Sequence, residues 1–194
     1  MFSLPCIIFA GGKSSRMGED KSLLPFGGFS SLSEFQYERL MPLFQSVHIS
    51  TKSADKFDFN ANFILDPAEV DYAPTAGFVS ALRMLDEDRI MVLSVDTPFI
   101  DERVFQTLID ADSGELDAVI AKTQTGSHPL CGIYHRSLLK EFERMLAEGD
   151  HRLGKLLSNA KTLYVEFSDE EPFANLNHPH EYKDAYERFD SKNR

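Results

Sequence analysis

The chain has 194 residues, of which 42% are hydrophobic, and its formal net charge is −11. This length is typical of one domain with a sizeable core, so we expect a single domain over residues 1–189 and a frayed polar tail at residues 190–194. The negative charge argues against binding to nucleic acid or to an anionic membrane surface, because both require broad positive potential. Any binding of phosphate groups must therefore be local.

The cysteine content and the opening segment bear on the compartment. Cys6 and Cys131 are too few for a disulfide framework and lack the spacing of a zinc site. The apolar residues 2–10 have no basic flank and are shorter than a membrane span or a signal-peptide core with its cleavage site. We therefore expect a cytoplasmic protein with no membrane partner.

The predicted elements begin with a buried strand at residues 5–10, whose apolar run stops at two glycines. Apolar residues at helical spacing then predict a helix at 32–44, capped by Ser31 or Ser33, and a strand at 47–51. The later elements, in chain order, are a strand at 63–66, a helix at 75–85, a strand at 90–96, a helix at 102–111, strands at 118–122 and 131–134, helices at 136–147 and 153–159, a strand at 163–167 and a helix from Pro179. This alternation predicts a single-domain, three-layer α/β/α fold of Rossmann-like type with a mainly parallel sheet.

The first strand leads into a glycine-rich loop at residues 10–21, AGGKSSRMGEDK, where three glycines surround Lys13, Arg16 and Lys21. Glycine lets consecutive backbone N–H groups approach phosphate oxygens, and the cations can neutralise their charge. The loop is neither GxxxxGK[ST] nor GxGxxG, so neither P-loop hydrolysis nor ordinary dinucleotide binding follows. The alternative is a tight turn with solvated cations, but three cations among three glycines after a buried strand favour phosphate binding.

The same stretch carries a family resemblance. AGGKSSRMGEDKSLLPF resembles the signature loop of the MobA-like nucleotidyltransferases, LAGGxSxRMGxDKxLL. The resemblance implies a fold of the nucleotide-diphospho-sugar transferase type, in which this loop cradles a triphosphate. It further implies that Gly11, Gly12, Arg16 and Lys21 contact the nucleotide, with Lys21 reaching a phosphate.

Asp96 follows a continuous hydrophobic strand, and Pro98 ends the run. Its carboxylate should therefore emerge at the carboxyl edge of the sheet, where open α/β sheets bind ligands. An oxygen ligand there suits Mg²⁺, although capping of the next helix is the alternative role. Asp96 is similar to the metal-binding aspartate of the family's CDxP strand end, which favours the metal role.

Near the end of the chain, FANLNHPHEY resembles the family's NxNTPED segment and places Asn175 and Asn177 on a turn before a helix. The resemblance implies that Asn177 is a neutral second oxygen ligand beside Asp96 and that both asparagines face the acceptor. Asparagine is also a common helix cap, so capping and function can coexist. The sequence departs from the family at His178, where the usual residue is Thr.

A second strand end carries Asp66, which stands before a proline and would alone indicate a turn. The resemblance implies instead that Asp66 contacts the nucleotide, because the family has an aspartate followed by GPLAG. Here APTAG stands at residues 73–77 instead, so only Gly77 of the loop's two glycines remains. The nucleotide contacts implied in all are Ala10, Gly11, Gly12, Lys13, Ser14, Arg16, Lys21, Asp66, Gly77 and Asp96.

Two residues of the second half complete the expected site. His128 lies in SHPLCGIY, which resembles the family's strand on the acceptor side, and Arg152 lies in a similarly placed stretch, GDHRLGKLL. The resemblance implies that both bind the acceptor. A lone histidine at the start of a strand is more often structural than an acid or base, and the expected chemistry needs no histidine.

The resemblance implies a magnesium-dependent transfer of GMP from GTP to the terminal phosphate of molybdopterin, with release of pyrophosphate. Lys21, Arg16 and Asp96 would be the catalytic residues. Gly12 favours GTP, because CTP-using relatives typically carry AAG instead of AGG. The alternatives are another nucleoside triphosphate, a sugar or alditol phosphate as acceptor, or a nonreactive nucleotide-binding module. Transient contact with proteins that deliver the cofactor or mature molybdoenzymes is also implied.

Overall fold

The structure is a computed structural model that describes residues 1–11, 20–67 and 73–192. The strands are β1 Phe2–Phe9, β2 Phe44–Thr51, β3 Phe63–Leu65, β4 Arg89–Ser94, β5 Ala118–Thr123, β6 Gly126–His135 and β7 Thr162–Glu166. The helices are α1 Leu32–Leu40, α2 Pro74–Met84, α3 Glu102–Asp110, α4 Leu139–Glu148, α5 Leu153–Asn159 and α6 Pro179–Lys192. Three short 3₁₀ turns are η1 Lys21–Leu23, η2 Arg136–Leu138 and η3 Glu171–Phe173.

The strands form one seven-stranded sheet in the order β3-β2-β1-β4-β6-β5-β7. All neighbouring strands are parallel except β6, which is antiparallel to both β4 and β5. This confirms the expected α/β class with a mainly parallel sheet. The strand order reverses between β1 and β4, because the chain moves outward from β1 to β3 on one side and continues from β4 on the other.

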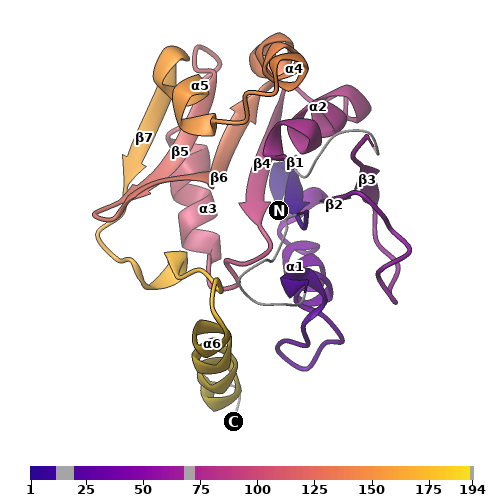
Figure 1. The fold of residues 1–194 in the computed structure, drawn as a ribbon. Helices are drawn as coiled ribbons and strands as arrows, with labels where there is room; N and C mark the ends of the chain where they lie inside the picture. The colour runs from indigo at the N-terminus through magenta and orange to yellow at the C-terminus, as the bar shows by residue number, and fades with distance from the viewer. Residues whose placement is uncertain (12–19, 68–72, 193–194) are drawn as a thin grey trace.

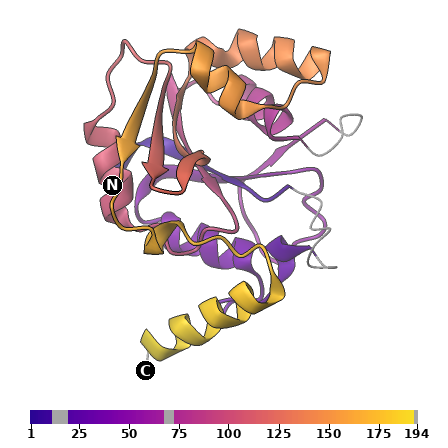
Figure 2. The ribbon, with the colours of Figure 1, turned by 60° about the vertical axis from the view of Figure 1, so that its left-hand side comes forward.

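The helices cover both faces of the sheet, as Figures 1 and 2 show. Alternate residues of β1 divide the core: Leu4, Cys6 and Ile8 belong to the cluster that also contains residues of α1 and α3. Ile7 and Phe9 belong to the cluster formed with α2, α4 and α5. A strand whose side chains are buried on both faces reads as a continuous apolar run, which is why the sequence identified it so clearly.

The strand β6 is longer than the expected strand at residues 131–134, because it begins at Gly126. Its register against β5 shifts between Ile120 and Lys122, opposite the part of β6 that contains Pro129. Proline cannot donate to a sheet ladder and is tolerated at such a bulge. Because the start of β6 is polar, the pattern of apolar residues did not predict it.

Other boundaries also differ from the expectation. The helix α1 ends at Leu40, and Phe44, expected to end it, instead begins β2. The apolar pattern merged the helix with the start of the following strand. The helix α6 continues through residues 190–192, which were expected to fray, and it projects below the sheet in Figure 1. Over the described part of the chain, no helix combines the length and the apolar character needed to cross a membrane.

Candidate active site

The candidate site lies where β1 and β4 end side by side. Phe9 pairs with Ser94 in the parallel ladder, so the residues that follow each strand leave the sheet at the same edge. The Val95 N–H donates to the Phe9 carbonyl at 3.1 Å, which holds the two exits together. Because the strand order reverses between these two strands, the helices that follow them diverge, and a crevice for ligands is expected there.

Three residues from distant parts of the sequence meet at this edge. Lys21 begins η1, and its ammonium donates a hydrogen bond to Asn177 Oδ1 at 2.8 Å. The same ammonium lies 3.7 Å from Asp96 Oδ2. The side chains of Lys21 and Asp96 are only 14% and 21% exposed, so their mutual attraction is weakly screened by water. The structure therefore brings together three residues that the sequence identified separately.

Asp96 is oriented by its neighbours and does not cap the next helix. The Ser94 hydroxyl donates to Asp96 Oδ1 at 2.6 Å, which leaves Oδ2 turned toward Lys21. The cap of α3 is Asp101, whose carboxylate accepts from the N–H groups of Arg103 and Val104. The alternative role considered for Asp96, capping of the following helix, is thus taken by another aspartate.

Asn177 is held by a turn at the start of α6. The N–H groups of Asn177 and His178 both donate to Glu181 Oε2, at 2.7 and 2.8 Å. Burial raises the pKa of Glu181, but these two hydrogen bonds, together with the nearby His178 and His180, lower the pKa below its ordinary value. The Leu176 N–H donates to the Asp96 carbonyl at 2.9 Å, so this turn is also tied to the end of β4. The expected turn before the last helix is present.

The donor chemistry at this point suits a divalent cation. Asp96 and Asn177 direct one carboxylate oxygen and one amide oxygen toward the same ammonium group. Mg²⁺ is typically held by one or two such protein oxygens, with substrate phosphates and water completing its shell. Over the residues that the structure describes, no group of three or more His, Cys, Asp or Glu side chains could enclose a metal. The two oxygens of Asp96 and Asn177 match the number of protein ligands that a cation shared with a phosphate substrate needs.

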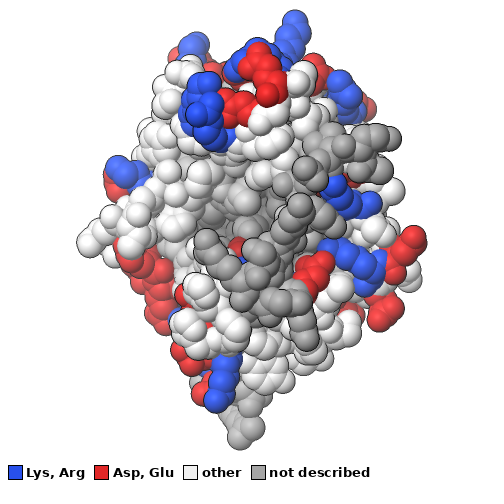
Figure 3. All heavy atoms as spheres, in the orientation of Figure 1, with Lys and Arg blue, Asp and Glu red and all other residues white. Residues whose placement is uncertain are grey.

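A cavity of about 290 Å³ opens beside Asp96 and Asn177. Its lining also includes His128, Phe173 and Asn175. Figure 3 shows that this face of the molecule is hollowed near its centre, with charged side chains mostly toward the rim. Three of the four expected acceptor residues thus line one cavity together with the expected metal ligands.

His128 forms part of an aromatic wall of this cavity. Its ring stacks on Phe173 with centroids 4.7 Å apart, and its Nε2 lies 3.1 Å from Thr123 Oγ1. Partial burial lowers the pKa of His128, because removal from water disfavours the imidazolium. A neutral, stacked imidazole suits contact with a planar ligand and agrees with a mechanism that needs no histidine as acid or base.

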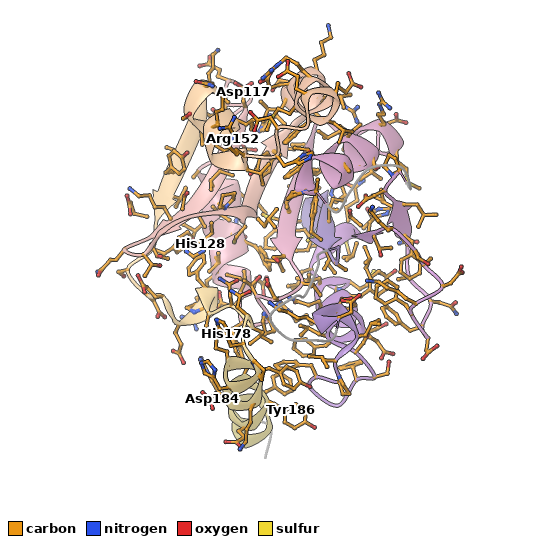
Figure 4. The ribbon with its side chains drawn as sticks, viewed as in Figure 1. Asp117, His128, Arg152, His178, Asp184 and Tyr186 are labelled. Atoms are coloured by element: carbon orange, nitrogen blue, oxygen red, sulfur yellow. The ribbon has the colours of Figure 1, made fainter. Side chains whose placement is uncertain are left out.

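Arg152 does not line this cavity. It lies at the start of α5, where its side chain is 72% exposed and pairs with Asp150 at 2.7 Å. Figure 4 shows Arg152 away from His128 and His178. The expected contact of Arg152 with the acceptor stays a prediction that the geometry of the cavity does not support.

Asp66, which directly follows β3, and Gly77 of α2 both lie against Ser50 of β2. The Ser50 hydroxyl donates to Asp66 Oδ1 at 3.1 Å. Burial raises the pKa of Asp66, while Ser50 and Lys52 oppose this shift. Gly77 belongs to α2, and a Cβ there would come within 2.6 Å of Ser50 Oγ. The glycine therefore allows the close packing that places the Asp66 carboxylate.

The departure of residues 73–77 from the family motif has a local explanation. Ala73 has φ −142° and ψ 134°, an extended conformation that does not require glycine. Thr75 is fully buried, and its hydroxyl lies 2.6 Å from His151 Nδ1. The segment is thus joined to the turn before α5 by a polar contact that the motif comparison did not indicate.

One basic residue near the glycine-rich loop was not predicted at all. Lys56 reaches Ala10 and Asp20, the first and nearly last residues of the loop. It lies in a polar stretch with no motif, so only the three-dimensional contacts identify it. The expected nucleotide contacts at Gly12, Lys13, Ser14 and Arg16 lie outside the described residues.

Comparisons with known proteins agree with the site. The model of the MobA-like NTP transferase domain matches residues 6–163. Molybdenum cofactor guanylyltransferase from Campylobacter jejuni (strain RM1221) is 38% identical over 97% of this chain and 96% of its own length. The protein of the same name from Helicobacter pylori (strain G27) is 33% identical over 93% of this chain and 90% of its own.

The crystal structure of molybdopterin-guanine dinucleotide biosynthesis protein A from Archaeoglobus fulgidus is similar to this chain with a TM-score of 0.83. It is 25% identical, and the alignment covers 97% of this chain and all of that one. This likeness confirms the expected fold type. Together with the nearly full-length relatives and the matching domain model, it shows that the chain belongs to the MobA-like NTP transferase family and is a nucleotidyltransferase.

Proposed function

We propose that this chain is a molybdenum cofactor guanylyltransferase, which transfers GMP from GTP to the terminal phosphate of molybdopterin and releases pyrophosphate. The observation that carries the proposal is the meeting of Lys21, Asp96 and Asn177 beside a cavity, in a chain with guanylyltransferase relatives over nearly its whole length. GTP is favoured over CTP by Gly12 in the AGG form of the loop.

The reaction needs positioning and charge neutralisation more than proton transfer. A terminal phosphate oxygen of the acceptor attacks the α-phosphorus of GTP, and the bond from that phosphorus to the bridging oxygen of the β-phosphate breaks. The nucleophile is already anionic, so no general base is required. Lys21 supplies positive charge that stabilises the charge developing on the phosphate oxygens, in a place where water screens it weakly.

Asp96 and Asn177 would hold Mg²⁺, which when bound supplies a Lewis acid for the phosphate oxygens. Ser94 fixes the Asp96 carboxylate, and Glu181 fixes the backbone of Asn177, so both oxygens are oriented before substrate arrives. The acceptor is proposed to occupy the cavity beside them, with its planar ring system against His128 and its polar groups near Asn175.

The partners and the location are proposed with the same function. The substrates are GTP and molybdopterin, and transient contacts with proteins that deliver the cofactor or mature molybdoenzymes stay predictions. Both cysteines are buried free thiols, which is compatible with the predicted reducing cytoplasm.

The deciding experiment combines the purified protein and Mg²⁺ with each nucleoside triphosphate and with molybdopterin or candidate sugar phosphates, and measures pyrophosphate. We expect release with GTP only when molybdopterin is present. Release with CTP, or with a sugar phosphate in place of molybdopterin, would replace the proposed substrates. If no pair of substrates reacts, the proposal is wrong and a nonreactive nucleotide-binding module is the better account.

A further inference from the structure

Lys56 lies in the connection between β2 and β3 and makes three polar contacts through its ammonium group. It donates to the Ala10 carbonyl at 3.2 Å, to Asp20 Oδ2 at 2.8 Å and to Ser22 Oγ at 3.0 Å. An ammonium has three N–H donors, so these contacts use its whole hydrogen-bonding capacity. The three acceptors belong to only two short segments of the chain.

These two segments are the ends of the glycine-rich loop. Ala10 directly follows β1, where the loop begins, and Asp20 and Ser22 lie on either side of Lys21, where it ends. Asp20 also caps η1 by accepting from the Ser22 N–H at 3.0 Å. The Lys56 ammonium therefore holds Ala10, at the start of the loop, close to Asp20 and Ser22, at its end.

The position of Lys56 is itself well determined. The next residue, Phe57, is buried and stacks on Phe63 of β3 with ring centroids 5.3 Å apart. The Lys56 ammonium lies 4.9 Å from the centroid of the Phe57 ring. Its side chain is 23% exposed and that of Asp20 is 34% exposed, so the pair is partly protected from water. The core of the sheet thus anchors the lysine that holds the loop.

The charge of Lys56 is already matched by a carboxylate. Burial raises the pKa of Asp20, but the hydrogen bonds from Lys56 and Ser22 outweigh it, so the pKa lies below its ordinary value and Asp20 is ionised at neutral pH. Lys21 also faces a carboxylate, but that carboxylate is Asp96 at the expected metal site, whereas the partners of Lys56 are the two ends of the loop. The contacts of Lys56 point to holding the loop and not to binding the transferred phosphate.

We infer that Lys56 is a positioning residue for nucleotide binding: its ammonium ties Ala10 to Asp20 and Ser22, and so holds together the two described ends of the loop at which the triphosphate is proposed to bind. This inference rests on the proposed function, because it assumes that the loop binds a nucleoside triphosphate. Lys56 lies outside the signature motif. We expect it to affect the affinity for GTP more than the rate of the chemical step.

The test compares Lys56→Met, which keeps the length of the side chain but removes its donors, with Lys56→Arg and with Lys183→Met. Lys183 is 75% exposed on α6, which makes the last variant a control for loss of one positive charge. Binding of GTP with Mg²⁺ is measured by calorimetry without any acceptor. KM and kcat follow from pyrophosphate release, and Tm from thermal unfolding.

For Lys56→Met we expect GTP binding about tenfold weaker and KM for GTP raised about tenfold, with kcat changed less than about threefold, since ground-state and transition-state binding are lost together. Lys56→Arg keeps a cation opposite Asp20 and should recover part of the affinity. Lys183→Met should match the unmodified protein. Unchanged GTP affinity in Lys56→Met, or a lower kcat at unchanged KM, would overturn the inference.

A second comparison separates positioning from a general loss of stability. Asp20→Asn should weaken GTP binding by itself, and adding Lys56→Met should weaken it little further, because both changes break the same contact. If the two substitutions weaken GTP binding independently, so that their effects multiply in the double variant, the inference is wrong. It is also wrong if the variants lose binding only because they unfold at the assay temperature. The calorimetric result is independent of the acceptor, so failure of molybdopterin to react does not affect it.

Discussion

Replacing Gly77 by alanine should test how closely α2 must approach the sheet. A Cβ at this position would lie 2.5 Å from Phe9 Cε1 and 2.6 Å from Ser50 Oγ, both shorter than real Cβ contacts allow. Alanine is favoured over glycine inside a helix by about 1 kcal/mol. Overpacking of a tight contact costs about 1–3 kcal/mol. We therefore expect a net loss of stability of about 0–2 kcal/mol, or a fall in Tm of up to roughly 8 °C.

The matched control is Gly154→Ala in α5, where an added Cβ meets nothing within 4 Å. This variant should gain only the higher helix propensity of alanine, about 1 kcal/mol of stability. For a chain of this size that corresponds to a rise in Tm of about 2–4 °C. Gly77→Ala should also raise KM for GTP, because Ser50 Oγ must move and it donates to Asp66. If Gly77→Ala raises Tm as much as Gly154→Ala does, the packing argument is wrong.

Three further predictions concern the site. Lys21→Met should lower kcat by about 100-fold or more, as loss of one transition-state donor does, while the protein remains folded; near-normal turnover in pyrophosphate release would refute its role. Asp96→Asn should raise the Mg²⁺ concentration needed for half-maximal activity, measured by titrating Mg²⁺ at saturating GTP; an unchanged requirement would remove Asp96 as a ligand. Asp66→Asn should stabilise the protein at neutral pH: burial raises the pKa of Asp66, so the folded state prefers the protonated form and loses stability as pH rises through that pKa. Urea unfolding at acid and neutral pH checks this, and an equal effect of the substitution at both would contradict it.

The sequence predicted those parts of the site that follow from strand ends and from a fixed motif. Asp96 is found because a continuous apolar strand ends just before it, and Lys21 because it closes the glycine-rich loop. Asp96 was expected at the carboxyl edge of the sheet, and the structure places Lys21 and Asn177 in contact at that point.

Residues that act through tertiary contacts could not be predicted. Lys56 stands in an irregular connection, and its importance depends on a carbonyl 46 residues away in sequence. His151 meets Thr75 only because α5 folds back beside the start of α2, a contact across 76 residues. The antiparallel β6 was placed correctly only at its apolar end, because Ser127, His128 and Pro129 give no strand pattern.

The hydrogen bond between Lys21 and Asn177 joins residues 156 positions apart. We expect a contact of such long sequence separation to form late in folding, because order in the chain between the two residues lowers the entropy cost of closure. In this order of events, β1 to β6 and their helices reach a native-like arrangement before the segment that carries Asn177 docks onto them. During refolding, secondary structure should return before catalytic competence, and the delay between the two signals would measure how fast that late segment docks.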